Sequence, residues 1–248
     1  MQFQPYERIV PGARYAALCI HGIVGTPMHF RDLLPLIPED WSICNMLLDG
    51  HGGQVEDFSR TSMKKWKTQV SAQLDRLLLT HEQVLIVAHS MGTLFAMDES
   101  IRRPERIRGL FLLDVPLTPR VTPGAAVSSL RLAFGQAKPN TPAGDMQNAS
   151  GVHLTPKLWK YLSWLPRFWE LLAEAHRSKV KLSQIFVPCL AFQSRQDELV
   201  SRRAYRILLE HPHIQVSELP NSGHFSYKGA DLELLQIKLS RLIQELSP

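Results

Sequence analysis

The sequence predicts an α/β protein with a doubly wound, mostly parallel sheet of about six or seven strands. Two observations lead to this fold class. Short apolar runs of strand length recur along the chain, and most of them are separated by amphipathic stretches of helical length. Near-continuous apolar runs are typical of strands covered on both faces, and alternation with helices is typical of a parallel sheet. The chain has 248 residues, which suits one large domain.

The predicted strands are the apolar runs themselves. "YAALCIHG" is the first clear one, and "QVLIVAHS" lies in the middle of the chain. The six predicted strands cover residues 15–22, 41–49, 83–90, 107–115, 187–194 and 213–220.

The predicted helices lie between these strands. In the stretch 61–81, apolar residues recur close to every 3.6 positions, as on the buried side of a helix. The periodic residues are Trp66, Val70, Leu74, Leu77 and Leu78. Further helices are predicted over 92–104, 204–211 and 230–246.

One long segment interrupts the alternation. Between Val115 and Ile185 no run resembles a strand; the first half is rich in Pro, Gly and small residues, and the second half is helical with a break at Pro166. So long an excursion within a compact α/β domain is most simply an inserted cap, or lid. We therefore predict a core formed by residues 1–114 and 186–248, with the cap at 115–185.

Composition narrows the classes of function. The net charge is +5, and the basic residues occur in small groups without aromatic interleaving, which does not favour a nucleic-acid site. Three cysteines in apolar runs, without a CxxC pair, are typical of core residues in a reducing compartment. No stretch is apolar enough for a signal peptide or a membrane span, so we expect a cytoplasmic protein.

One predicted strand ends in a serine with small neighbours. In Ala88-His89-Ser90-Met91-Gly92, the serine lies between a buried run and a predicted helix. The pattern is G-x-S-x-G with alanine in first place, and it is typical of a sharp turn that raises a nucleophilic hydroxyl out of the sheet. An ordinary N-cap serine has the same position. A serine hydroxyl is a weak nucleophile, so catalysis also requires a base and a group that orients the base.

Two downstream loops offer these groups. Asp197 follows the predicted strand 187–194, and His224 lies in the loop "NSGHFS" after the strand 213–220. Ser, Asp and His in this chain order form one of the known arrangements of a catalytic triad. Asp114, at the end of the strand that follows the serine helix, is the rival acid, and Glu198 is a third candidate. Loop placement favours Asp197.

An oxyanion hole is the third requirement of such a site, because backbone N–H groups must stabilise the tetrahedral intermediate. One donor is expected from Met91, the residue after the nucleophile. The other is expected from Ile23, in the glycine-rich loop "HGIVG" after the first strand. A lone His-Gly pair would indicate no more than a turn.

Five segments, taken together, resemble the α/β-hydrolase superfamily. They are "LCIHGIVGTP", "LLDGHGG", "AHSMGT", "SRQDELVS" and "SGHFS", and they occur in the order found in compact bacterial carboxylesterases and monoacylglycerol-lipase-like enzymes. The resemblance covers both ends of the chain but not the segment 115–185. Ala88 departs from the usual first glycine of the serine motif, and the short N-terminal stretch implies that the usual first strands are reduced.

The resemblance implies a serine esterase. Ser90 would attack an ester carbonyl and form an acyl-enzyme, with His224 as base, Asp197 as its orienting acid, and the N–H groups of Ile23 and Met91 as oxyanion donors. The partner would be a small-molecule ester. No metal or organic cofactor is implied, because the His, Asp and Cys residues show no ligand spacing.

Other functions remain open from the residues. A thioesterase, an amidase or a carbon–carbon bond hydrolase would use the same triad. A hydrolase-fold binding protein without activity usually lacks a triad member, whereas here all are present. A dehalogenase is disfavoured because it needs aspartate where Ser90 stands.

Aromatic residues in the second half of 115–185 suggest the class of ester. They are Trp159, Tyr161, Trp164, Phe168 and Trp169. They can simply pack the cap onto the sheet, but those that face the serine would line an apolar pocket. We therefore expect short- to medium-chain acyl esters, including monoacylglycerols, as substrates.

Overall fold

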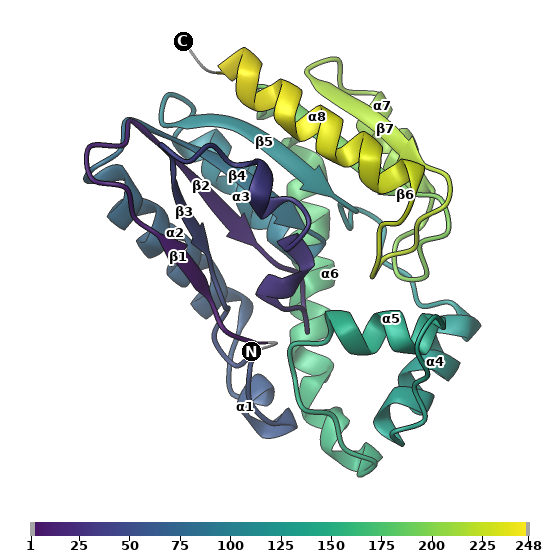
Figure 1. Ribbon diagram of the computed structural model, residues 1–248. Helices are drawn as coiled ribbons and strands as arrows, with labels where there is room; N and C mark the ends of the chain where they lie inside the picture. Colours follow the sequence, from purple (N-terminus) through teal and green to yellow (C-terminus); the bar gives the residue numbers. More distant parts are fainter. Residues whose placement is uncertain (1–2, 247–248) are drawn as a thin grey trace.

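The computed structural model describes residues 3–246 (Figure 1). The strands are β1 (Tyr6–Arg8), β2 (Tyr15–Ile20), β3 (Ser42–Asn45), β4 (Gln83–His89), β5 (Ile107–Leu113), β6 (Cys189–Ser194) and β7 (Ile214–Leu219). The α-helices are α1 (Val55–Ser59), α2 (Met63–Leu78), α3 (Met91–Arg102), α4 (Pro123–Ala133), α5 (Pro142–Ala149), α6 (Leu165–Lys181), α7 (Arg203–Leu209) and α8 (Ala230–Leu246). The 3-10 helices are η1 (Pro27–Phe30), η2 (Leu34–Leu36), η3 (Leu158–Trp164) and η4 (Leu182–Gln184).

Within residues 3–246, the strands form one seven-stranded sheet in the order β1-β3-β2-β4-β5-β6-β7. All neighbours are parallel except β1, which is antiparallel to β3. The predicted doubly wound α/β fold is thus confirmed. The sequence did not indicate β1, because its three residues, Tyr-Glu-Arg, are polar or exposed and form no apolar run.

Helices cover both faces of the sheet, and each face has its own core. On one face α2, α3, α6 and α7 pack against alternate strand residues such as Leu18 and Ile86. On the other face α8 and the η1–η2 stretch pack against residues such as Val87 and Phe111. In α2 the predicted period places Trp66, Val70, Leu74 and Leu77 in the core. These buried contacts fix the central strands whose carboxyl ends carry the site.

Three α-helices, α4, α5 and α6, and two 3-10 helices, η3 and η4, occupy the chain between β5 and β6. In Figure 1, α4 and α5 lie beyond the carboxyl ends of the strands, and α6 runs back along the sheet, where it packs against α3. The sequence did not predict α4 and α5, since their prolines indicated a loop. Pro123 and Pro142 lie in the first turn of each helix, where proline needs no hydrogen-bond donor, and Thr122 and Thr141 cap the two N-termini.

Two further sequence features can be located in the structure. Cys19, Cys44 and Cys189 are buried and free. Among residues 3–246, no helix has both the length and the apolar character needed to cross a bilayer.

Candidate active site

Ser90 lies at the sharp turn between β4 and α3. Its backbone has φ 50° and ψ −125°, a strained conformation for a residue with a side chain. The turn is tight because α3 starts directly against β2: a Cβ added to Gly92 would lie 2.2 Å from the Ile20 carbonyl oxygen. The Ser90 N–H donates to the Leu113 carbonyl oxygen at 2.8 Å, which ties the turn to β5. The small residue at this position of the motif is therefore a packing requirement.

A continuous chain of hydrogen bonds joins the three residues singled out in the sequence. His224 Nε2 is 3.1 Å from Ser90 Oγ, and His224 Nδ1 is 2.7 Å from Asp197 Oδ2. All three side chains are buried, so water competes little for these bonds. Nδ1 donates to the carboxylate, which leaves Nε2 unprotonated and able to accept the serine proton.

The loop after β6 holds Asp197 rigidly. Its Oδ1 accepts from the N–H groups of Leu199 and Val200 at 2.6 and 2.7 Å, leaving Oδ2 for His224. The Arg120 guanidinium donates to the Asp197 carbonyl oxygen at 2.9 Å. One carboxylate oxygen therefore orients the acid and the other orients the base.

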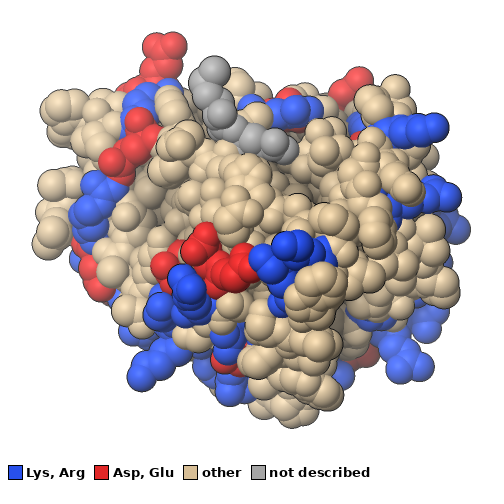
Figure 2. All heavy atoms as spheres, turned by 90° about the horizontal axis from the view of Figure 1, so that it is seen from below, with Lys and Arg blue, Asp and Glu red and all other residues tan. Residues whose placement is uncertain are grey.

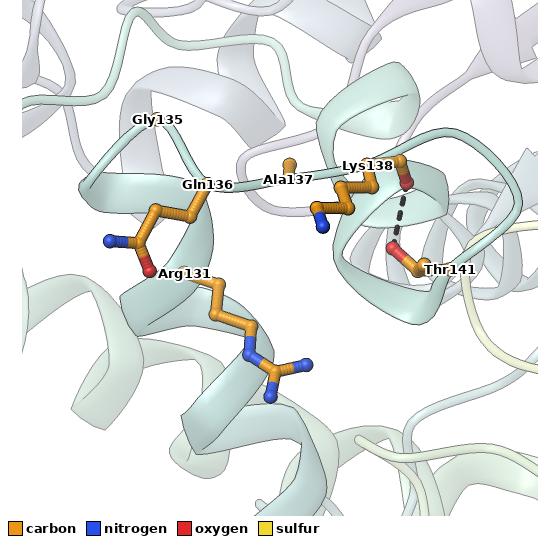
Figure 3. Close-up of a pocket in the computed structure, with 6 residues that line it drawn as sticks. All are labelled: Arg131, Gly135, Gln136, Ala137, Lys138 and Thr141. Atoms are coloured by element: carbon orange, nitrogen blue, oxygen red, sulfur yellow. Dashed lines mark hydrogen bonds between the residues drawn. The ribbon is translucent and has the colours of Figure 1, made fainter.

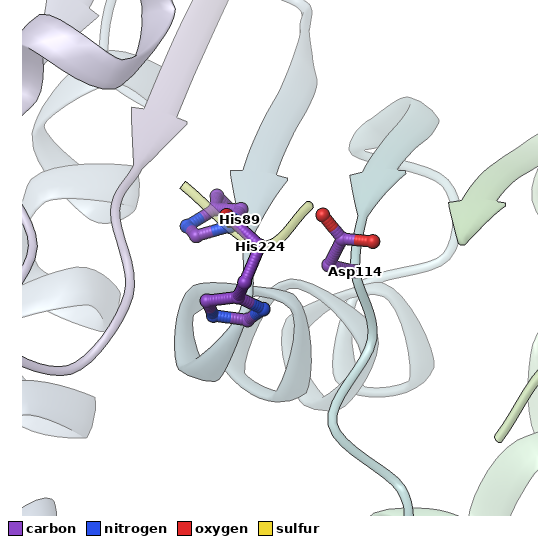
Figure 4. Close-up of side chains that lie close together, drawn as sticks. All are labelled: His89, Asp114 and His224. Atoms are coloured by element: carbon purple, nitrogen blue, oxygen red, sulfur yellow. The ribbon is translucent and has the colours of Figure 1, made fainter. Parts of the chain in front are cut away.

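The rival acid, Asp114, forms its hydrogen bonds with residues other than His224. Its carboxylate accepts from the Ser194 N–H and hydroxyl at 2.6 and 3.1 Å, and from the Tyr227 hydroxyl at 2.7 Å. Burial and the nearby Asp197 charge raise the pKa of Asp114 to about 7. Asp114 lies near the His224 ring (Figure 4), but no hydrogen bond joins the two side chains. The geometry favours Asp197 as the partner of the imidazole.

Glu198, the third candidate acid, contacts the histidine by another route. Its Oε2 accepts the backbone N–H of His224 at 3.0 Å. The carboxylate therefore fixes the loop that carries the histidine rather than the ring. This role was not visible in the sequence, where Glu198 stood out only as the neighbour of Asp197.

The loop after β2 lies directly against the serine. A Cβ added to Gly22 would be 2.7 Å from Ser90 Cβ, so only glycine allows this approach. The Gly25 N–H donates back to the Gly22 carbonyl oxygen at 3.0 Å and closes a tight turn around Ile23. Met91 begins α3, where first-turn N–H groups have no acceptor within the helix. Both candidate oxyanion donors therefore belong to backbone segments that border Ser90.

Four other histidines lie around this site: His21, His51 and His89 are buried, and His29 is half-buried. Burial lowers the pKa of His29 to about 3 and that of His51 to about 4, and it places the pKa of His21 and of His89 well below the usual range. Neighbouring histidines add to the effect at His21, His29 and His89, since His29 stacks on His89 with ring centroids 3.7 Å apart. These rings stay neutral at ordinary pH, so they do not supply the titrating base.

His224 behaves in the opposite way. Burial alone would lower its pKa, but the Asp197 carboxylate at Nδ1, with Asp114 and Glu198 nearby, raises the pKa of His224 to about 9. The ring is thus stabilised in the charged state that it reaches when it accepts a proton.

We expect kcat/KM for an ester to fall on acidification, with its midpoint above ~6.5, the value for free histidine. The sign follows from the raised pKa, because His224 must be neutral to act as base and is protonated below its pKa. The measurement is a pH profile of kcat/KM for a p-nitrophenyl ester. Asp114→Asn removes one nearby negative charge, so this variant should move the midpoint to lower pH. A profile that is flat from mildly acidic to alkaline pH would contradict a histidine base.

One group of side chains in the site has the composition of a metal site. Possible ligand atoms of His89, Asp114 and His224 lie within 4.8 Å of one another (Figure 4). The His224 nitrogens already contact Asp197 and Ser90, and His89 Nε2 is 3.1 Å from the His224 carbonyl oxygen. Asp114 is bonded to Ser194 and Tyr227. The polar atoms are thus engaged in a protein hydrogen-bond network.

The segment between β5 and β6 contacts the loops of the site. The Gly151 N–H donates to the Val24 carbonyl oxygen at 2.6 Å, next to Ile23. Gly52 donates to the Gly151 carbonyl oxygen at 2.6 Å, and His153 donates to that of Gly53 at 2.9 Å. Asp145 in α5 accepts hydrogen bonds from Ser226 and Lys228, which follow His224. These bonds attach the segment to loops that adjoin the site, and Ser90 itself is 4% exposed.

The aromatic residues of this segment are distributed between the interior and the surface. Trp164 is buried beside Phe58, and Tyr161 is half-buried. Trp159, Phe168 and Trp169 are exposed to solvent, so they do not line an enclosed pocket. A pocket of about 470 Å³ lies against 150–156, and none of Ser90, Asp197 and His224 lines it. Its lining includes the apolar residues Phe3, Leu132, Phe134, Val152, Leu154 and Pro156 and the polar residues Gln147, Ser150 and His153.

Comparisons with known proteins identify the family of this fold. The family model described as "Alpha/beta hydrolase family" matches residues 17–233. A thermostable monoacylglycerol lipase from Bacillus sp. (strain H-257) is 26% identical over 189 residues, which are 74% of this chain and 70% of that protein. A structure of the metagenome-derived lipolytic enzymes LipS and LipT has a TM-score of 0.72 at 21% identity and covers 97% of both chains. The monoacylglycerol lipase of Paleococcus ferrophilus has a TM-score of 0.68 at 16% identity over the whole of both chains.

Proposed function

Because the chain belongs to the alpha/beta hydrolase family, we propose that it hydrolyses carboxylic esters, with Ser90 as the nucleophile. The observation that carries the proposal is the buried hydrogen-bond chain from Ser90 through His224 to Asp197. In this proposal, His224 is the general base and Asp197 fixes its tautomer. The lipolytic relatives support a carboxylic ester hydrolase as the class of enzyme.

The reaction proceeds in two halves. In the first, Ser90 Oγ attacks the ester carbonyl carbon while His224 Nε2 takes the hydroxyl proton, and His224 then gives that proton to the departing alcohol. In the second, water attacks the acyl-enzyme, with His224 again as base, and the carboxylic acid leaves as Ser90 regains its proton. The Asp197 carboxylate stabilises the imidazolium that forms in each half.

The N–H groups of Ile23 and Met91 receive the oxyanion in this mechanism. The contact between Gly22 and Ser90 supports the assignment, because it brings the loop after β2 next to the carbon that carries the nucleophile. The strained backbone of Ser90 also supports it, since the turn directs the hydroxyl away from the sheet and toward the start of α3. Donors fixed in this way need no rearrangement as negative charge develops.

We propose that residues 115–185 form a cap over the site. We also propose that the pocket beside 150–156 receives the acyl chain. The cavity volume of about 470 Å³ is in the range of small-molecule pockets. Gly151, beside the cavity-lining residue Val152, bonds to the loop that carries Ile23. The names of two relatives point to monoacylglycerols as the substrate class. Short- to medium-chain acyl groups suit a cavity of this size.

A series of p-nitrophenyl esters tests both the activity and the acyl pocket. With acyl chains from about two to sixteen carbons, kcat/KM should rise to a maximum at short or medium length, because each buried methylene contributes about 0.8 kcal/mol. A monoacylglycerol should also be hydrolysed. A steady decline from the acetyl ester onward would disprove the acyl pocket, and absence of turnover across the series would disprove the esterase.

The same series distinguishes the related reactions of this triad. A thioester and an anilide with the best acyl chain should react with lower kcat/KM than the ester. A higher value for the thioester or the anilide would reassign the protein to a thioesterase or an amidase. A dienol substrate, in which a carbon–carbon bond hydrolase would cleave a carbon–carbon bond, serves as the control for that reaction.

A further inference from the structure

An apolar surface lies on the outside of η3 and the first half of α6. Trp159 is 67% exposed and Trp169 is 69% exposed, although tryptophan is usually largely buried. The other large apolar side chains exposed on η3 and the first half of α6 are Leu158, Leu162, Leu165, Phe168 and Leu172. We call these seven residues the outer face. An exposed apolar group of this size on one element indicates a binding surface.

Helix α6 shows that the outer face is not a by-product of core packing. Its inward side buries Leu171 and Ala175, and this is the side that attaches the helix to α3. Its outward apolar residues are Leu165, Phe168, Trp169 and Leu172, which have the spacing i, i+3, i+4, i+7 of a second stripe. The fold requires only the first stripe, so the second is available to a partner.

Helix α4 adds apolar side chains at the same end of the molecule (Figure 1). Val127, Leu130 and Phe134 are exposed along one side of this helix and its end. Figure 2 looks onto this end and shows broad areas without Lys, Arg, Asp or Glu, a group of acidic and basic side chains near the middle of the view, and further Lys and Arg toward the border. Exposed apolar side chains and basic side chains thus occur at the same end of the molecule.

The charge of the chain is concentrated in the same segment. Residues 115–185 contain nine Lys and Arg against three Asp and Glu, a net charge of +6, whereas the remainder contains nineteen against twenty. No ion pair is found for Lys157, Arg131 or Lys138 among residues 3–246. Arg131 and Lys138 border one hollow of about 540 Å³ at the turn between α4 and α5 (Figure 3). These cations are free to meet external anions.

We propose that the outer face docks on the surface of an anionic lipid membrane. Trp159 and Trp169 would lie at the headgroup level, which tryptophan prefers, with the leucines and Phe168 reaching the acyl boundary. Lys157, Arg131 and Lys138, for which no ion pair is found among residues 3–246, would face lipid phosphates, which attract such cations. This docking is separate from ester hydrolysis, because none of the outer face belongs to the site around Ser90.

A second copy of the chain is a less suitable occupant of the outer face. Self-association through it would bring together two segments of net charge +6, and like charges across an interface oppose binding. An anionic membrane can accept both the apolar outer face and the cations Lys157, Arg131 and Lys138. The charge distribution therefore selects the lipid surface.

The test is co-sedimentation of the full chain with vesicles, without any substrate. One set is pure phosphatidylcholine, and in the other roughly a third of the lipid is phosphatidylglycerol, so that binding should rise on the order of tenfold in the second set. Trp41, Trp66 and Trp164 are buried. Anionic vesicles should therefore shift tryptophan fluorescence to the blue and protect Trp159 and Trp169 from an aqueous quencher.

The variant Trp159→Gln/Trp169→Gln should lose binding by about tenfold or more, since each indole carries a large apolar area. The matched control is Leu79→Gln/Ile237→Gln, and it should bind like the unchanged protein. Leu79 lies just after α2 and is 83% exposed, and Ile237 lies on α8 and is 56% exposed. Circular dichroism checks that both variants are folded.

Absence of binding, equal binding to both vesicle types, or unchanged binding by the tryptophan variant would each overturn the proposal. Analytical ultracentrifugation without lipid tests the alternative that the outer face binds a second copy of the chain. A dimer that the tryptophan substitutions dissociate would assign the outer face to self-association.

Discussion

A Ser90→Ala protein is expected to lose ester turnover by a factor on the order of 10⁴ or more while it keeps its fold. The substitution removes the only atom that forms the acyl-enzyme in the proposed mechanism. The backbone of the turn stays in place, because the Ser90 N–H bond to Leu113 and the contact of Gly92 with β2 do not involve the hydroxyl. Both side chains carry a Cβ, so the strain at φ 50° is unchanged.

Steady-state turnover of the best p-nitrophenyl ester measures this loss. A fluorophosphonate probe should label the unchanged protein at Ser90 and leave the variant unlabelled. Ser100→Ala is the matched control: it removes another buried hydroxyl from α3, which donates to the Met97 carbonyl oxygen, and it should retain activity. Near-normal turnover by folded Ser90→Ala protein would remove the proposed mechanism.

Asp197→Asn should reduce turnover by about 10⁴-fold, because an amide N–H₂ opposite His224 Nδ1 favours the wrong tautomer. The asparagine oxygen can still accept from Leu199 and Val200, so the loop should remain in place. The amide nitrogen then faces Nδ1 as a donor, the ring proton moves to Nε2, and Ser90 loses its acceptor.

Asp114→Asn is the comparison for this variant. The hydroxyls of Ser194 and Tyr227 can act as donors or acceptors, so an amide can replace the carboxylate in their network. Turnover at the pH optimum should therefore fall far less than in Asp197→Asn, as measured with the same ester at saturating concentration. If Asp114→Asn lost more turnover than Asp197→Asn, the acid of the mechanism would be Asp114.

The sequence predicted the parts of this protein that depend on local pattern. The apolar runs located six of the strands, and the period of residues such as Trp66 and Val70 located α2. Helices α4 and α5 escaped prediction because proline at a first helical turn and proline in a loop look alike without the backbone. Strand β1 was not predicted because its three residues lie at the edge of the sheet and form no apolar run.

For the site, the sequence indicated Ser90, Asp197 and His224 through loop placement and chain order, and the structure brings these side chains into contact. It left Asp114 as a rival, since both acids follow neighbouring strands. Only the direction in which each carboxylate points shows which of them reaches His224. It gave no sign that Glu198 holds the His224 backbone. That contact joins loops 26 residues apart, and no local pattern encodes it.

The aromatic residues of 115–185 show another limit of pattern. In a helix with apolar residues on two sides, the sequence does not reveal which side meets the core. In α6 the smaller side, with Ala175, is buried, and the side with Trp169 is exposed. Whether a tryptophan lines a pocket or faces solvent is decided by tertiary packing.

The backbone bonds around Gly151 restrict how the segment 115–185 can move. Gly151 fits so closely that a Cβ there would lie 1.8 Å from the Gly25 carbonyl oxygen, and a rigid swing of the whole segment would break the bonds of Gly151 and His153 at once. Because Val24 accepts the Gly151 N–H, a displacement of Gly151 would also move Val24 and the adjacent Ile23, which is an oxyanion donor in the proposed mechanism.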